Sequence, residues 1–246
     1  KRLPKNVQLA YWDYSPEQPE PYRRRIAKHR ALGFDPIVAS GCHIWGHLWH
    51  EARSLTMPRV AACVRACRAS KARELLMTLW TGIAGVDLDS AWAGLAFAAE
   101  QAFHESPSPQ LLQRRYRAVC RADYRASLAG ALAIWRISPA VGAPSLLWDD
   151  PLLGMFLRSL HARDGRLLAR IASHYHRLAL RLRRWRGSNE AGDIDHARLL
   201  AGFLAHKADL SLRLQRAYRR KSIAALRTVR AEIPAQRRRL GQLQES

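Results

Sequence analysis

Three short apolar runs, spaced roughly 30 to 40 residues apart, most constrain how the first part of this chain can fold. They cover residues 7–11, 36–39 and 75–79, and a loop rich in glycine, proline or aromatic residues follows each run. Amphipathic patterns typical of helices lie between and after them, at residues 21–32, 57–70 and 90–104. This alternation predicts successive βα units on a parallel sheet, because parallel strands are joined by crossover helices. Asp89 or Ser90 is the expected N-cap of the third helix.

The strand pattern ends near residue 104, and helix-forming residues dominate the rest of the chain. Ser108 followed by Pro109 predicts a helix start, with serine as the N-cap and proline at the first helical position. Longer helical patterns cover residues 165–185, 193–220 and 222–243, and Pro234 is expected to interrupt the last one. The sequence therefore predicts two domains, an α/β domain at residues 1–104 and an all-α domain at residues 105–246.

The charge is strongly positive, with 41 Lys and Arg against 20 Asp and Glu, a formal net charge of +21. Such a surface attracts polyanions, and a basic helical module that binds nucleic acid or acidic glycans is one open interpretation. The arginines are spread over many predicted helices and no recognition motif accompanies them, so we predict no nucleic-acid partner.

No uninterrupted apolar run reaches 18 residues, which predicts no membrane-spanning helix. The first residues lack the apolar core of a signal peptide, and four irregularly spaced cysteines do not form a disulfide framework. We therefore expect a cytoplasmic protein. The chain begins at Lys1 rather than Met, which suggests a fragment of a longer protein.

A carboxylate stands among aromatic side chains at the end of the first predicted strand, in the order Tyr11, Trp12, Asp13, Tyr14. This group of side chains suits a sugar ligand, because an indole packs against the C–H face of a sugar while a carboxylate accepts hydrogen bonds from its hydroxyls. Strand alternation predicts Tyr11 and Asp13 on one side and Trp12 on the other.

Histidines follow the second predicted strand at positions 43, 47 and 50, beside Glu51, and by composition resemble a metal site. The spacing of His43 and His47 lacks the intervening glutamate of zinc proteases, and glycines surround it, so we predict polar loop residues and no metal. Cys63 and Cys67 are expected to be buried helix residues. No phosphate-binding loop or serine nucleophile motif occurs, so we predict no cofactor.

Several segments together resemble the family 20 glycoside hydrolases, the β-N-acetylhexosaminidases. Residues 7–14, residues 39–41 with Trp45, and residues 78–80 resemble the last three βα units of that family's barrel. Residues 146–154 and 204–210 resemble the helical C-terminal domain of one bacterial subgroup. The resemblance implies a partial (β/α)8 TIM barrel of about three βα units, followed by an all-α domain.

The resemblance also implies a substrate and a set of substrate-binding residues. The family removes terminal N-acetylhexosamine, using the acetamido oxygen of the sugar as nucleophile. By resemblance, Tyr11 orients the acetamido group, Asp13 holds ring hydroxyls, and the indoles of Trp45 and Trp80 line the pocket. Two departures weaken the match, since His43 replaces the first tryptophan of a pair and Gly82 replaces an acidic residue.

The family's catalytic Asp-Glu dipeptide does not occur in this sequence. We therefore expect this chain to supply a sugar-binding wall, to need the N-terminal half of the barrel as partner, and to be inactive alone. Two alternatives stay open: a decayed homologue that binds sugar without hydrolysing it, and the basic helical binding module.

Overall fold

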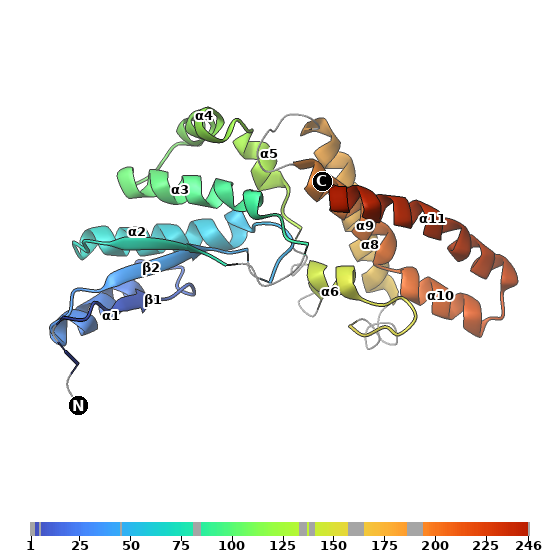
Figure 1. Cartoon of the computed structure of the whole chain (residues 1–246), viewed down its shortest axis with the longest axis horizontal. Coiled ribbons are helices and arrows are strands. Elements are labelled where there is room, and N and C mark those ends of the chain that lie inside the picture. The colour runs from blue at the N-terminus through green and yellow to red at the C-terminus, as the bar shows by residue number, and fades with distance from the viewer. Residues whose placement is uncertain are drawn as a thin grey trace.

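The computed structural model describes residues 3–4, 6–44, 46–80, 85–132, 137, 141–156, 165–185 and 194–245. Figure 1 shows an elongated molecule, with a small sheet and the earlier helices at one end and the later helices at the other. The described part of the chain is mostly helical. None of its helices combines the length and the apolar character needed to cross a membrane.

The sheet has three parallel strands in chain order, β1 (Ala10–Trp12), β2 (Ile37–Cys42) and β3 (Leu75–Leu79). The predicted parallel arrangement is confirmed, and β3 has the predicted bounds. β2 extends past its predicted end because Gly41 and Cys42 pair with Thr78 and Leu79 of β3. The described residues thus support three parallel βα units, and a closed barrel is not seen among them.

Two helices cover one face of this sheet, α1 (Pro19–Ala31) and α2 (Met57–Ala69), and a short π-helical turn, η1 (Ala52–Thr56), precedes α2. Both helices lie close to their predicted positions. The apolar layer between sheet and helices is continuous, and it consists of Tyr11, Tyr22, Ile26, Val38, Ala62, Cys63, Ala66 and Cys67. The two helix cysteines are buried in this layer and form no disulfide, as expected.

A second helical layer packs on α2. It comprises a 3-10 turn, η2 (Leu88–Ala91), followed by α3 (Trp92–Phe103), α4 (Pro109–Cys120) and α5 (Tyr124–Ala129). One apolar cluster joins these helices to α2, built from Val60, Val64, Ala93, Phe97, Ala98, Leu112, Tyr116, Ala122 and Tyr124. The helices α4 and α5, predicted as part of the C-terminal domain, therefore share a core with α2 and α3.

The caps of this layer are partly as predicted. The Ser108 hydroxyl accepts a hydrogen bond from the Leu111 amide at 3.1 Å, and α4 begins at Pro109, which confirms that prediction. The predicted N-cap of α3, Asp89 or Ser90, is wrong. The Asp87 carboxylate instead caps the preceding turn, η2, by accepting a hydrogen bond from the Asp89 amide at 2.9 Å. The Ser90 hydroxyl instead donates to the Asp87 carbonyl oxygen at 2.6 Å.

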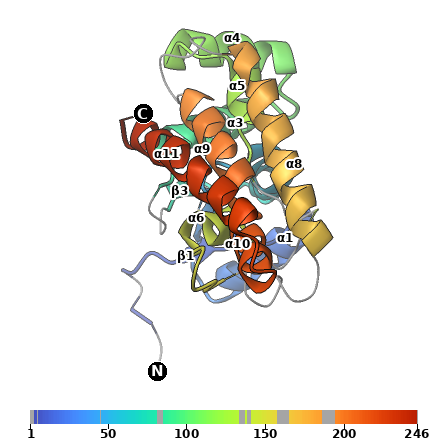
Figure 2. The same ribbon diagram turned by 90° about the vertical axis from the view of Figure 1, so that its right-hand side faces the viewer.

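The C-terminal part contains α6 (Ala143–Trp148), α8 (Gly165–Leu182), η3 (Arg183–Trp185), α9 (Ile194–Lys207), α10 (Leu210–Arg219) and α11 (Ile223–Glu245). Figure 2 faces these helices and shows α9 between α8 and α11. Their core includes Leu168, Ile171, Tyr175, Leu178, Leu182, Leu200 and Leu204. The apolar stripes of the sequence thus meet at the centre of the bundle.

Two expectations for these helices are wrong. The pattern at 193–220 forms two helices, since a turn at Ala208 and Asp209 separates α9 from α10. Ala208 and Leu210 are both buried, so the turn lets each helix keep its own apolar side on the core. Conversely, α11 continues through Pro234. Proline has no N–H, so the main-chain carbonyl of Arg230 loses its helical hydrogen bond. Both residues are exposed. Water can replace that hydrogen bond at an exposed position.

The loop after β2 joins the two parts of the molecule. Leu48 and Trp49 are fully buried in the same apolar cluster as α8 and α9. The Trp49 Nε1 group donates to the main-chain oxygen of Ser127 at 3.1 Å, and its ring lies against Gly130, where an added Cβ would come within 2.4 Å of Cε2. This loop of the α/β part is therefore a core element of the helical part.

Candidate functional site

The carboxyl ends of β1, β2 and β3 lie side by side, because all three strands are parallel and neighbouring. Ligand sites in parallel α/β folds form at this edge. Tyr11 and Trp12 end β1, and Asp13 and Tyr14 follow it. Thr78 and Leu79 end β3, and Trp80 follows it.

Tyr11 and Asp13 are brought together on the helix-covered side of the sheet. The Tyr11 hydroxyl donates to Asp13 Oδ2 at 3.1 Å, and the Ser15 amide donates to Asp13 Oδ1 at 2.9 Å. Tyr11 is only 7% exposed, and burial, followed by the neighbouring Asp13 charge, raises its pKa far above the ordinary value. The phenol therefore stays protonated and holds the half-buried carboxylate in place.

Trp80 is placed with Trp12 instead, on the sheet face opposite Tyr11. The two indoles stack with ring centroids 5.3 Å apart and an interplanar angle of 29°. Both remain about half exposed, Trp12 at 50% and Trp80 at 47%. This half-exposed stacked pair at the end of the parallel sheet is an apolar platform, and a ligand can contact its outer ring faces.

A chain of hydrogen bonds fixes this pair of indoles. The Tyr14 hydroxyl accepts from Trp12 Nε1 and from Trp80 Nε1, the latter at 2.8 Å. It also lies 2.7 Å from Thr78 Oγ1, whose hydroxyl donates to the Ser40 carbonyl oxygen at 3.0 Å. Tyr14 must then donate to Thr78, because its two acceptor positions are used by the indoles. The platform is thus anchored to β2 and β3.

Gly41 makes room for this arrangement. A Cβ at position 41 would lie 2.7 Å from Thr78 Oγ1 and 2.9 Å from Tyr14 Cε1. These distances are shorter than van der Waals contact, so a larger residue would displace both hydroxyl-bearing side chains. The site therefore requires glycine at this position of β2.

We predict that Gly41→Ala disrupts the platform and costs about 1–3 kcal/mol, as overpacked sites do. Denaturant unfolding measures the free energy, and tryptophan fluorescence reports the Trp12 and Trp80 environment. Gly202→Ala in α9 is the matched control, because an added Cβ there meets no atom within 4 Å. That control should be neutral or more stable, since alanine favours helix. Wild-type stability and fluorescence in Gly41→Ala would contradict the prediction.

His43 lies against Tyr14, with ring centroids 6.2 Å apart. Its Nε2 atom is 3.1 Å from Arg59 Nη1 and 3.3 Å from the Tyr14 main-chain oxygen. Burial, and then the Arg59 charge, lower the pKa of His43 to about 4. His43 is therefore neutral at pH 7 and supports the main chain of Tyr14.

His50 belongs to the same polar group. Thr56 Oγ1 accepts from the His43 amide at 2.8 Å and lies 2.8 Å from His50 Nε2. His50 is 2% exposed, and burial lowers its pKa to about 3. Within the described residues, no three His, Cys, Asp or Glu side chains are grouped to hold a metal ion.

The sequence-predicted site residues thus divide into two groups. Tyr11 and Asp13 share one hydrogen bond, whereas Trp80 contacts Trp12 and Tyr14. Trp45 and Gly82 lie outside the described residues. The prediction omitted Trp12 and Tyr14 as site residues, although their i, i+2 spacing placed both on the same side of the strand.

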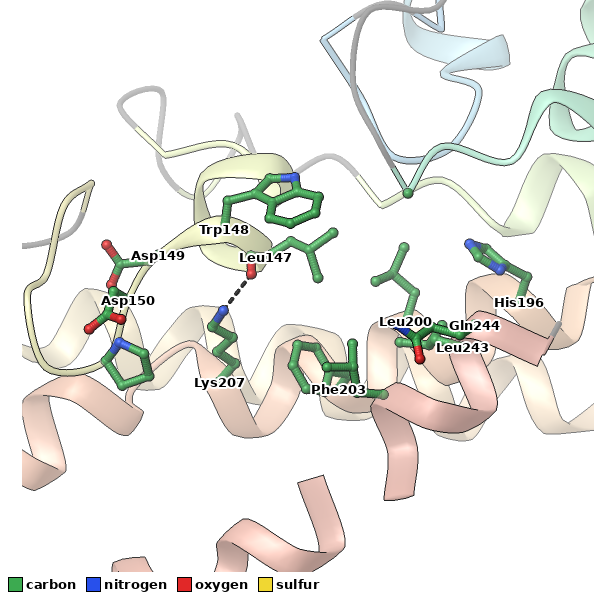
Figure 3. Close-up of a pocket in the computed structure, with 13 residues that line it drawn as sticks. Leu147, Trp148, Asp149, Asp150, His196, Leu200, Phe203, Lys207, Leu243 and Gln244 are labelled. Atoms are coloured by element: carbon green, nitrogen blue, oxygen red, sulfur yellow. Dashed lines mark hydrogen bonds between the residues drawn. The ribbon is translucent and has the colours of Figure 1, made fainter. Parts of the chain in front are cut away.

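Apart from the indole pair, a cavity lies in the helical part of the chain. It has a volume of about 580 Å³ and is lined by Gly85, Leu147, Trp148, Asp149, Asp150, Pro151, His196, Leu200, Phe203, Lys207, Leu240, Leu243 and Gln244. Figure 3 shows Lys207 reaching from α9 to the main-chain oxygen of Leu147. This bond joins the two segments, 146–154 and 204–210, that suggested the helical domain in the sequence.

The acidic residues of the first segment build its turn. Asp150 Oδ1 accepts from the amides of Leu152 at 2.7 Å and Leu153 at 2.8 Å, which lowers the pKa of Asp150. Asp149 Oδ1 accepts from the Phe156 amide at 2.7 Å. The two aspartates therefore shape the chain after α6, as Asx turns do.

Residues 142–246 match the family model of the Glycoside Hydrolase 20C C-terminal domain. The helical part of the chain is therefore similar to this domain, and residues 142–246 are called the 20C domain below. Both sequence segments that suggested it lie inside the match, so the predicted resemblance is confirmed for this part of the chain. The match begins at Gly142, the N-cap of α6. No curated protein sequence matches the chain.

Proposed function

We propose that this chain is the C-terminal part of a β-N-acetylhexosaminidase-like glycoside hydrolase. Its three βα units would be the last units of a (β/α)8 barrel that is followed by the 20C domain. The observation that carries the proposal is the exposed indole pair, Trp12 and Trp80, at the carboxyl end of the parallel strands and next in sequence to Asp13. The 20C domain supports the hydrolase class.

The division of roles follows from the contacts. Trp12 and Trp80 would pack on the apolar face of the terminal sugar. Asp13 lies with Tyr11 on the other side of the sheet, so it would accept hydrogen bonds only from hydroxyls that reach past the carboxyl end of β1. Tyr11 already donates to Asp13, so it would orient an acetamido group only after leaving that carboxylate. We therefore assign Tyr11 as a positioning residue of Asp13.

The proposed chemistry needs residues beyond these. Glycoside cleavage requires a proton for the leaving oxygen, and general acid catalysis contributes roughly 10² to 10⁴ in rate. The family's Asp-Glu pair does not occur in this sequence, so we propose that the N-terminal half of the barrel supplies it. That half would also pair with the outer edges of β1 and β3, which have no partner strand among the described residues.

The domain boundary is part of the proposal. The sequence places it between residues 104 and 105, but α4 and α5 share a core with α2 and α3. The 20C match starts at residue 142. We therefore propose that the barrel part extends through α5 and that the helical domain begins near residue 142.

We expect Trp12→Ala and Trp80→Ala each to weaken binding of N-acetylglucosamine at least about fivefold, because stacking on an aromatic ring contributes about 1 kcal/mol or more. Saturation-transfer NMR and tryptophan fluorescence titration measure the affinity. Trp92→Ala is the matched control, since Trp92 is 45% exposed but its indole N–H donates to Asp89 and not to Tyr14. If Trp80→Ala and wild type bind the sugar with equal affinity, the indole pair is not part of the sugar-binding site.

A further inference from the structure

A second, smaller pocket lies between α8, α9 and α11 of the 20C domain, and cationic side chains dominate it. Its volume is about 210 Å³. Three arginines and two histidines line it: His176 from α8, Arg183 from η3, Arg198 and His206 from α9, and Arg239 from α11. Three elements distant in sequence thus bring five basic groups to one place.

The carboxylates nearby are already paired. Asp195 binds Arg198, with Nε and Oδ1 2.7 Å apart, and Glu232 forms a two-pronged pair with Arg213 at 2.7 and 2.9 Å. Arg183 and Arg239 have no carboxylate partner anywhere in the described part of the chain. Among the described residues, the positive charge of these two arginines in the pocket is therefore not balanced by a carboxylate.

The positive charge around the pocket affects the pKa of His206. Burial lowers its pKa, and the charges of Arg239, Arg213 and His176 lower it further, against the opposing effect of Glu232. Like charges held this close repel each other, and a bound anion would relieve that repulsion.

We propose that this pocket binds a tetrahedral oxyanion, a phosphate or sulfate group, between Arg183, Arg239 and His206. Guanidinium groups match such oxygens because their N–H donors form a planar fork. The pocket volume of about 210 Å³ is below the roughly 300 Å³ typical of pockets for drug-sized ligands, so one ionic group fits it. The inference does not depend on the sugar platform.

Thermal unfolding in increasing sodium phosphate, with ionic strength held constant by sodium chloride, tests the site. A bound anion raises the unfolding temperature in a saturable way, because it binds the folded state only. We expect Arg239→Gln to weaken the apparent phosphate affinity at least about tenfold, as loss of a charge-assisted hydrogen bond does. NMR titration of His206 should show its pKa rising when phosphate is present.

Arg237→Gln is the matched control, because Arg237 lies on the same helix, is exposed and does not line the pocket. It removes the same charge, so it should keep wild-type phosphate affinity. Equal weakening in the two variants, or a response that does not saturate, would show general attraction to a +21 surface and overturn the proposal. Arg183→Gln provides a second pocket variant with the same expected loss.

Sodium sulfate and phenyl phosphate, compared under the same conditions, identify the source of the anion. Tighter binding of phenyl phosphate than of phosphate assigns a monoester ligand, and equal binding assigns a free ion. Binding of a DNA duplex is compared for wild type, Arg239→Gln and Arg237→Gln. If all three bind it equally and phosphate has no saturable effect, the surface binds polyanions nonspecifically and the proposed small-anion site is overturned.

Discussion

Replacing Trp49 by alanine is expected to lower the free energy of unfolding by about 3–5 kcal/mol, the range for deleting a buried aromatic side chain. Trp49 is fully buried in the core of the 20C domain although it belongs to the loop after β2. Its removal leaves a cavity and also leaves the Ser127 carbonyl without its donor. Because the loop connects the two parts, their cooperativity in unfolding should fall as well.

Denaturant unfolding followed by circular dichroism and by tryptophan fluorescence measures both effects. In the wild type the two transitions should coincide, and in Trp49→Ala they should separate. Trp49→Phe should cost less, because it keeps most of the packing and loses the indole N–H. Trp92→Ala, on a half-exposed side chain, should cost about 1 kcal/mol or less. A similarly small cost for Trp49→Ala would show that this loop does not anchor the helical domain.

Acidification from pH 7 to pH 5 is expected to destabilise the protein through His43 and His50. Burial lowers the pKa of His43 to about 4 and that of His50 to about 3, whereas an unfolded histidine titrates near 6.5. Between these values the unfolded chain takes up protons that the folded chain does not, so stability falls as the pH falls. Each histidine contributes about 1.4 kcal/mol per pH unit below 6.5, or about 4 kcal/mol for both at pH 5.

Variants isolate this contribution from that of other titrating groups. His43→Gln and His50→Gln should each flatten the dependence of unfolding free energy on pH between 7 and 5 by about 2 kcal/mol. Gly202→Ala serves as control, because it changes no titratable group and an added Cβ there meets no atom within 4 Å, so the slope should not change. Parallel pH profiles for wild type and both buried-histidine variants would contradict the assigned cause.

Local sequence signals predicted part of the fold well. β3 has its predicted bounds, and α4 begins at Ser108-Pro109, because an apolar run and a helix cap depend on residues adjacent in sequence. The 20C domain was also recognisable, since two of its segments are distinctive in sequence. Strand alternation correctly separated Trp12 from Tyr11.

The candidate site was less predictable. Tyr11, Asp13 and Trp80 were chosen from the sequence, but the pairing of Trp80 with Trp12 through Tyr14 depends on which face of the sheet α1 and α2 cover. No local pattern contains that information, because the helices reach the sheet only through long-range packing.

The sequence by itself therefore determined the type and order of the elements, the helix starts with strong caps, and the identity of the C-terminal domain. Only the tertiary structure decided that Trp49 fills the core of that domain, that α9 and α10 are separate, and that Arg183 and Arg239 share a pocket. The physical reason is that propensity and capping act within one helical turn or a few strand residues. Burial and charge clustering instead arise from contacts between residues tens of positions apart.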